Sequence, residues 1–238
     1  LKFFGGFGIG LLLNAIFGEA GFLGLLPLAV IGAVTNSNGV IYATLAGEYG
    51  DESDVGATAI LTLNDGPFFT MIALGTAGIG KFPITAIMAS IIPLIIGFII
   101  GNLDHEWRET LSTAMALLPP FNGFCLGAGM SFFTIAGAGF SGILLGLLTV
   151  AVTGILTFII YSLIRRKADP MGTVAGVAAT TPAAIADADP SFAPQVETSS
   201  AQIAAATIVT AIVTPLLVAF LARWSRKFNE KHGLGNAK

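Results

Sequence analysis

Four consecutive polar residues, Thr35 to Asn38, interrupt a long apolar run of the chain. Apolar side chains predominate before them, at residues 22–30, and after them, at residues 40–45. In hydrocarbon, each unpaired polar group costs several kcal/mol, so these groups must face protein, water or a ligand. A second interruption of the same kind, Thr180-Thr181-Pro182, comes much later. These two breaks are therefore the first candidates for a functional site.

The composition of the whole chain is that of a polytopic, all-α membrane protein. Of its 238 residues, 54% are hydrophobic and only 11% are charged, whereas a soluble domain carries about 25% charged residues. Long apolar runs recur along the sequence and predict membrane helices, and we find none of the short alternating segments of outer-membrane barrels. We predict eight segments, at residues 3–17, 21–47, 56–78, 83–101, 110–131, 139–164, 171–190 and 201–223.

The basic residues test this count of segments. If the segments alternate in direction, ten of the eleven Lys and Arg residues lie on one side of the membrane and only Lys81 lies on the other. Basic residues accumulate on the cytoplasmic side, so the sequence predicts a cytoplasmic C-terminus and cytoplasmic loops at 48–54 and 102–109. The residues assigned to this side are Lys2, Arg108, Arg165, Arg166, Lys167, Arg223, Arg226, Lys227, Lys231 and Lys238.

The predicted segments also contain an internal repeat. Two triplets share one order: a helix, a broken helix, and a helix that contains a proline. The first triplet consists of 3–17, the broken 21–47, and 56–78 with Pro67. The second consists of 139–164, the broken 171–190, and 201–223 with Pro215. The triplets are five segments apart, so their orientations are opposite. Paired broken helices in inverted halves point to the binding site of a secondary transporter. Five-helix repeats imply ten helices with two broken crossing helices, so about eight of ten are present here.

We therefore expect one transmembrane transporter domain over residues 1–238. Residues 1–78 end the first repeat, 79–230 form the second, and 231–238 are a cytoplasmic tail. The sequence begins with Leu1 rather than Met and its first apolar run is short, so we expect an N-terminal truncation.

Neutral hydrogen-bonding residues occupy the breaks: Asn36, Ser37 and Asn38 in the first, Thr180 and Thr181 in the second. They either satisfy the broken backbone or bind a ligand. A half-helix N-terminus carries roughly +0.5 charge, so two of them meeting near the midplane would hold an anion. No Lys or Arg occupies the centre of a predicted segment. The pattern favours a small, anionic, hydroxyl-rich substrate, and the thinly spread net charge of −3 excludes a nucleic-acid partner.

Two acidic residues inside segments are candidates for proton coupling. Asp65 lies mid-segment beside Asn64 and Pro67, where proline frees a backbone carbonyl; we assign Asn64 to the substrate. Asp187 follows the second break. An ionisable residue in the membrane is a functional hypothesis by default; the alternative for Asp65 is a structural carboxylate that pairs with freed N–H groups. Asp189 is nearer the segment end, where it would meet water.

Residues 137–142 match two motifs that we reject. The first motif is GxGxxG, but here it has neither the preceding strand nor the acidic residue further on that a dinucleotide-binding site requires. GxSG resembles the nucleophile motif of rhomboid proteases, with Ser141 as nucleophile, but the histidines are His105 in a loop and His232 in the tail. Glycine-mediated helix packing is the better interpretation. No cluster of Cys and His predicts a metal site, and an intramembrane hydrolase is a weak alternative.

Several short motifs along the chain form a recognisable pattern. They are Asn38-Gly39, Tyr42-Ala43, Gly66-Pro67, Thr70-Met71-Ile72, Leu74 to Ile79, Gly101-Asn102-Leu103-Asp104, Arg108-Glu109, Thr181-Pro182 and Trp224-Ser225-Arg226-Lys227. These motifs resemble the 2-keto-3-deoxygluconate permease family, over essentially the whole chain and that family's final three-quarters. The resemblance implies a proton-coupled importer of a pectin-derived sugar acid in the inner membrane, with no cofactor. It also implies a fold similar to the bile-acid/sodium symporters, in which two broken helices cross.

The sequence also departs from the family pattern. The family has an acid where Thr35 stands and a Glu where Asn64 stands, and here the acid near the kink is Asp65. Asp187 matches a family acid. We therefore expect residues 36–38 to bind substrate and Asp65 and Asp187 to handle protons. The alternative within transport is a sodium-coupled organic-anion symporter of the same fold.

Overall fold

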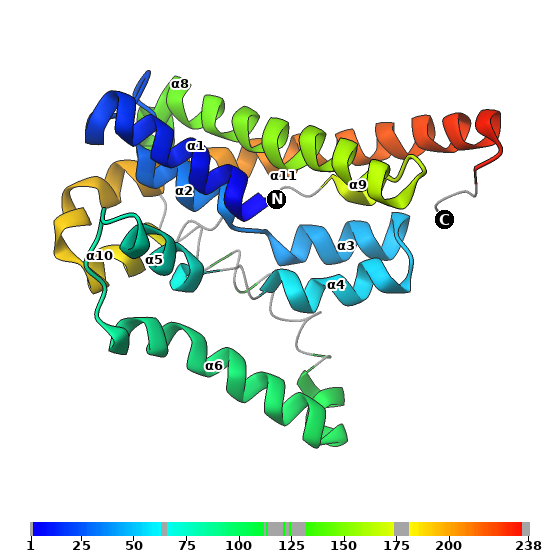
Figure 1. Cartoon of the computed structure of the whole chain (residues 1–238), viewed down its shortest axis with the longest axis horizontal. Coiled ribbons are helices and arrows are strands. Elements are labelled where there is room, and N and C mark those ends of the chain that lie inside the picture. Colours follow the sequence, from blue (N-terminus) through cyan, green and yellow to red (C-terminus); the bar gives the residue numbers. More distant parts are fainter. Residues whose placement is uncertain are drawn as a thin grey trace.

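The computed structural model describes residues 2–62, 66–111, 113, 121, 124, 132–173 and 181–234, and within them it is helical without a β-sheet. Figure 1 shows α1, α2, α8 and α11 lying together, an α3–α4 hairpin beside them, and α6 standing apart. The helices are α1 (Lys2–Phe17), α2 (Pro27–Thr35), α3 (Gly39–Tyr49), α4 (Glu52–Thr62), α5 (Pro67–Thr76), α6 (Ile84–Leu103), α8 (Phe132–Thr149), α9 (Thr157–Arg165), α10 (Thr181–Ala188) and α11 (Ala193–His232). The prediction of an all-α membrane protein is confirmed.

Among the described residues, four helical stretches are long and apolar enough to cross a membrane. They are Lys2–Ala20, Ile84–Leu103, Ala136–Arg165 and Pro190–His232. The segments predicted at 3–17, 83–101, 139–164 and 201–223 are thereby found. The segment predicted at 110–131 lies mostly outside the described residues, and the division of the chain into repeats stays a prediction.

Glycines bring the helices of the main bundle into close contact. Gly6 and Gly10, one turn apart, place α1 directly against α2: a Cβ added at Gly6 would lie 2.8 Å from Val34 Cβ. On α8, a Cβ at Gly142 would lie 2.5 Å from Ala205 Cβ of α11. Small residues permit such contacts in lipid. The packing interpretation of the glycines in 137–142 therefore holds for Gly142.

The first break is present where the sequence predicts it. Helix α2 ends at Thr35, and Asn36 and Asn38 have extended backbones (ψ 160° and 95°) before α3 begins at Gly39. The start of the predicted segment is wrong, because residues 22–25 form a turn closed by an isolated bridge between Phe22 and Leu25, and α2 begins only at Pro27.

Four further predicted ranges differ from the structure. The segment predicted at 56–78 is two helices, α4 and α5, so its proline marks a break rather than a kink. The loops predicted at 48–54 and 102–109 are much shorter, because α4 already begins at Glu52 and the chain is helical again from residue 105. Helix α11 has 40 residues, about 60 Å at 1.5 Å per residue, and extends well beyond both ends of 201–223.

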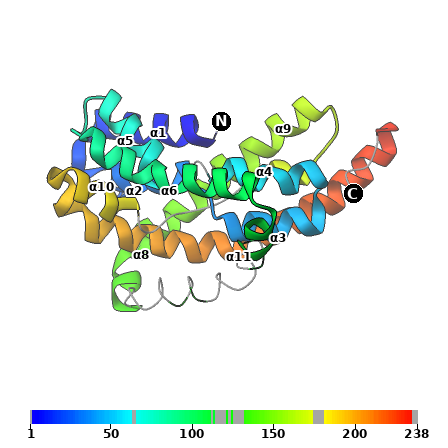
Figure 2. The same ribbon diagram turned by 90° about the horizontal axis from the view of Figure 1, so that it is seen from below.

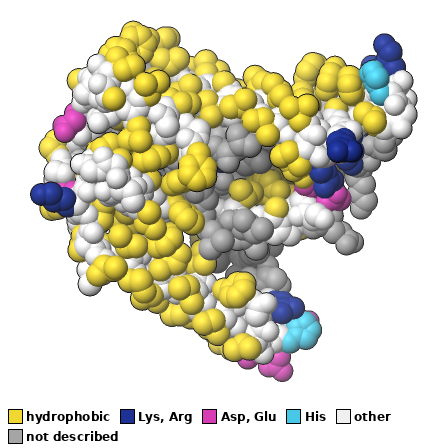
Figure 3. Space-filling view, viewed as in Figure 1, with side chains coloured by type: hydrophobic (Ala, Val, Ile, Leu, Met, Phe, Trp, Pro, Cys, Tyr) yellow, Lys and Arg dark blue, Asp and Glu magenta, His cyan; other side chains and the backbone are white. Residues whose placement is uncertain are grey.

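Charged and hydrophobic side chains occupy different parts of the molecular surface. On the face drawn in Figure 3, hydrophobic side chains cover the middle and charged side chains gather at the ends. Helix α6 contains no buried residue. Helix α8 lies along α11 (Figure 1), and α9 diverges from α11 beyond it (Figure 2). This arrangement fits a protein whose middle faces lipid.

Candidate substrate site

Three of the four polar side chains in the first break bond to the backbone of the broken helix. Thr35 Oγ1 donates to Ile31 O (2.6 Å) and Asn36 Nδ2 donates to Gly32 O (2.8 Å), so both satisfy carbonyls at the end of α2. Asn38 Oδ1 accepts from Ile41 N (3.2 Å) and caps α3. These bonds supply partners that a helix terminus otherwise lacks.

Asn36 also connects the first break to the start of α5. Its Oδ1 accepts a hydrogen bond from Gly66 N (2.8 Å), and its side chain is fully buried. Gly66 has a φ of 106°, in the region that favours glycine, and Pro67 opens α5. The N-termini of α3 and α5 therefore meet at this break. Asn64 and Asp65 lie outside the described residues, and their predicted roles stay predictions.

A lysine that sequence reasoning did not assign to the site lies at the same break. Lys2 Nζ donates a 2.9 Å hydrogen bond to Ser37 Oγ, and both side chains are buried. The structure buries this side chain, and the predicted place of Lys2 on the cytoplasmic side stays a prediction. Its position follows from the close, glycine-mediated contact of α1 with α2, which brings the first turn of α1 to the level of Ser37. The spacing of Gly6 and Gly10 is the sequence signal that could have indicated this contact.

Helix α10 packs against α2 and α5. Thr181 is its first residue, and Thr180 lies outside the described residues. Ile185 belongs to a buried cluster with Leu28 and Ile31 of α2 and with Met71 and Leu74 of α5. The half-helices next to the two predicted breaks therefore pack together. Their grouping into one substrate site stays a prediction.

The two acids of this region differ in their surroundings. Asp187 has an exposed side chain on α10, and its predicted role in proton coupling is not decided by this position. Asp189 Oδ2 accepts from Lys81 N (2.6 Å) and its Oδ1 from Ser191 N (3.0 Å). Asp189 therefore organises the loops at this end of the molecule.

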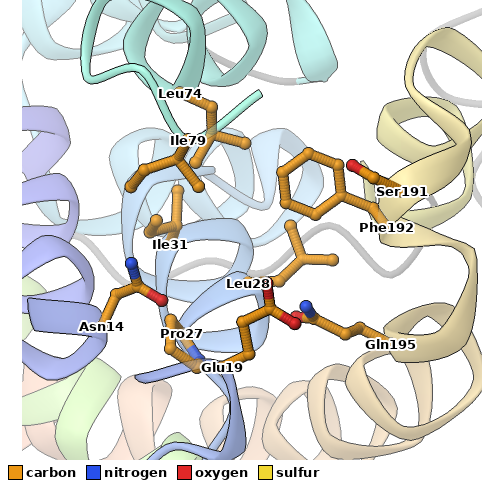
Figure 4. Close-up of a pocket in the computed structure, with 10 residues that line it drawn as sticks. All are labelled: Asn14, Glu19, Pro27, Leu28, Ile31, Leu74, Ile79, Ser191, Phe192 and Gln195. Carbon is orange, nitrogen blue, oxygen red and sulfur yellow. The ribbon is translucent and has the colours of Figure 1, made fainter. Parts of the chain in front are cut away.

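A small pocket lies away from the break, at the other end of α2. Figure 4 shows Asn14, Glu19 and Gln195 around its rim, with Leu28 and Ile31 of α2 on its wall. Its volume of about 40 Å³ suits water, whereas small-molecule sites occupy about 300–1,000 Å³. We therefore place the candidate site at the break rather than in this pocket.

Comparison with known proteins identifies the family. The family model described as "2-keto-3-deoxygluconate permease" matches residues 1–227. The chain belongs to the 2-keto-3-deoxygluconate permease family. It is 47% identical over 219 residues to 2-keto-3-deoxygluconate permease 1 of Salmonella typhimurium, covering 91% of this chain and 69% of that protein. It is 40% identical over 214 residues to 2-keto-3-deoxygluconate permease of Escherichia coli K12, covering 88% of this chain and 64% of that protein. No solved structure matches.

Membership of a permease family makes the chain a transporter rather than an enzyme, and the surroundings of Ser141 agree. Ser141 Oγ donates to Ala138 O (2.7 Å) and accepts from Gln202 Nε2 (3.2 Å). Gln202, buried on α11, also donates to Gly24 O and accepts from Leu26 N (3.3 Å). Ser141 thus joins a structural network that ties the turn before α2 to α8 and α11.

The permease also contains an ionic network that sequence reasoning missed. It joins the α3–α4 hairpin to α9 and the turn after it. Arg165 Nη2 lies 2.8 Å from Asp51 Oδ2, and Arg165 Nε lies 3.4 Å from Asp169 Oδ2. Tyr161 OH donates to Asp54 Oδ1 (2.9 Å), and Asp54 is itself buried.

The carboxylates of this network have opposite pKa shifts. The hydrogen bond from Arg165, helped by the backbone N–H of Asp54, lowers the pKa of Asp51 to about 2. Burial raises the pKa of Asp169, against the hydrogen bond from Met171 N. In the sequence, residues 48–54 suggested only an acidic loop, because Arg165 and Asp51 are far apart along the chain.

Proposed function

We propose that this permease imports 2-keto-3-deoxygluconate or a similar sugar acid across the inner membrane together with protons, with its C-terminus in the cytoplasm. The observation that carries the proposal is the break at residues 36–38, where the N-termini of α3 and α5 meet beside a buried lysine. An anionic sugar acid matches this polarity. The choice of sugar acid follows from the names of the relatives.

Proton coupling is the finer part of the proposal. Asp65 is the first candidate, since it directly precedes Gly66, whose N–H bonds to Asn36. Asp187 on α10 is the second. Protonation of either acid would change the charge near the bound substrate, and the equilibrium between outward-open and inward-open forms would shift with it.

Uptake into proteoliposomes tests this function. Labelled 2-keto-3-deoxygluconate should accumulate when the outside is acidified, and a proton ionophore should abolish the accumulation. Asp65→Asn should do the same, whereas Asp104→Asn should not, since asparagine preserves the cap that Asp104 Oδ1 gives to Trp107 N (3.1 Å). Accumulation that survives the ionophore and depends on sodium instead of choline would favour the sodium-coupled alternative.

A further inference from the structure

Basic side chains gather at the C-terminal end of α11, where the apolar part of the helix stops. They are Arg223, Arg226, Lys227 and Lys231, and all four are exposed. Within the described ranges of the chain, none of the four forms an ion pair. Figure 3 shows Lys, Arg and His side chains at this end of the molecule. Basic clusters that directly follow a membrane helix attract anionic lipid headgroups.

Three rings form a continuous stripe beside these charges. Trp224 and Phe228 stack with their ring centroids 5.0 Å apart, and the His232 ring lies 4.3 Å from that of Phe228. Trp224 is 44% exposed and Phe228 is 36% exposed, and such rings prefer the level of the lipid headgroups. At about 100° per residue, Lys231 and Lys227 are rotated by about 20° and about 60° to one side of Trp224. One flank of the stripe is therefore basic.

The other flank of the stripe is covered by the turn that follows α9. Ser225 and Asn229, one helical turn apart, are both buried on this side of α11. Asn229 bonds to both Ala168 N and Ala168 O at 2.9 Å, which holds the turn against the helix. Arg166, two residues before Ala168, is exposed. The packing of the turn therefore adds a basic residue from a second element at the same end of α11.

The two arginines of this end of α11 have other surroundings. Arg223 lies near the α3–α4 hairpin, where its charge opposes the rise in the pKa of Tyr49. Arg226 is rotated by about 160° from Trp224, so it lies on the side of α11 away from the rings. Only the two lysines thus lie beside the stripe on the helix itself.

We propose that Lys227, Lys231 and Arg166 bind the phosphate group of an anionic phospholipid. Trp224 and Phe228 then lie against the glycerol region and the first carbons of its acyl chains. A free anion in water would gain the charges but leave the rings uncovered, so the combination of rings and charges fits a lipid. The inference concerns the surrounding membrane and does not depend on the transported solute. Each basic residue at such a surface is worth about five-fold in affinity.

Quenching of Trp224 fluorescence by brominated lipids tests the inference. The chain has two tryptophans, so Trp107→Phe in the full chain leaves Trp224 alone. The protein is placed in phosphatidylcholine nanodiscs with increasing amounts of brominated phosphatidylglycerol or, separately, of brominated phosphatidylcholine. Phosphatidylglycerol should quench Trp224 at a fraction at least about five-fold lower than phosphatidylcholine does. Lys227→Gln and Lys231→Gln should each reduce this preference by about five-fold. Arg226→Gln removes the same charge from the far side of the helix and should leave the preference unchanged.

Each other result would overturn the inference. Equal quenching by the two lipids would exclude a site for anionic lipid. An equal loss in Lys227→Gln and Arg226→Gln would show an effect of net charge instead of a site. Inorganic phosphate that abolishes the preference at constant ionic strength would assign these residues to a free anion. If a lysine variant does not fold, the preference of the Trp107→Phe protein must still fall as salt is added, and a preference that salt does not change would contradict the inference.

Discussion

Replacing Asn36 by leucine should separate the first break from α5. Asn36 Oδ1 accepts from Gly66 N and Asn36 Nδ2 donates to Gly32 O, both at 2.8 Å in a fully buried position. Leucine has a similar size and cannot replace either bond. Each buried group left without a partner costs about 1–3 kcal/mol, and interhelical hydrogen bonds in membranes lie at the low end of such values. We expect a loss of about 2–3 kcal/mol in the free energy of unfolding.

A second asparagine of the same chain provides the control. Asn102 Nδ2 donates to Phe98 O at 2.7 Å, which is the same bond to the carbonyl four residues earlier, but on an exposed helix end. Asn102→Leu should change the unfolding free energy by less than about 0.5 kcal/mol. Unfolding of both variants in mixed detergent micelles, followed by helical circular dichroism, measures the difference.

The comparison has a clear point of failure. If the two variants lose the same small amount, Asn36 does not hold the break to α5, and the convergence of two half-helix N-termini loses its support. A large loss confined to Asn36→Leu establishes that the polar residues of the break are structurally required before any substrate binds.

Two further predictions concern the other end of the molecule. Asn229→Leu should speed proteolysis of the turn at 166–172, because Asn229 bonds to both Ala168 N and Ala168 O at 2.9 Å and both groups would be left unpaired; unchanged cleavage would contradict this. The folded-state pKa of Asp51, about 2, is below its ordinary 3.8, so its bond to Arg165 stabilises the fold above about pH 4, and this stability is lost as the pH falls through about 2. Solvent screening at a side chain that is 40% exposed limits the loss to about 1 kcal/mol. Asp51→Asn should therefore be less stable than wild type at pH 6 in thermal unfolding, and the gap should narrow as the pH falls toward 2 and close below it. A gap of the same size at pH 6 and at pH 2 would refute the linkage.

The sequence predicts the helical class and the first break well, because both follow from the cost of polar groups in hydrocarbon. Four adjacent polar residues inside an apolar run leave few alternatives to an interrupted helix. The packing of Gly142 was equally accessible, since glycine in a membrane segment usually marks a close helix contact. These predictions need only local composition and spacing.

Helix ends were predicted less well, because the length of an apolar run reports the thickness of the membrane and not the full length of the helix. Residues 193–200 and 224–232 are mostly polar but continue α11, because polar and charged residues do not oppose a helix and Pro194 lies in its first turn, where proline is tolerated. Asp51 starts α4 inside the predicted loop by accepting bonds from Ser53 N and Asp54 N at 2.9 and 3.0 Å. An acid at this position is favourable for a helix N-terminus, which the assignment of 48–54 as an acidic loop did not consider.

Lys2 could not be placed from the sequence, because its location depends on the pairing of two helices. Charge counting assigns a lysine at the start of an apolar segment to the membrane surface. The contacts of Gly6 and Gly10 with α2 instead bring Lys2 to Ser37. The absence of Lys and Arg from segment centres was thus no guide to the charge of the site. Besides the helix N-termini, a lysine side chain lies within hydrogen-bonding distance of the break. Polarity located the break in the sequence, but the bonds that reach it from outside the broken helix, from Lys2 to Ser37 and from Gly66 N to Asn36, depend on tertiary packing.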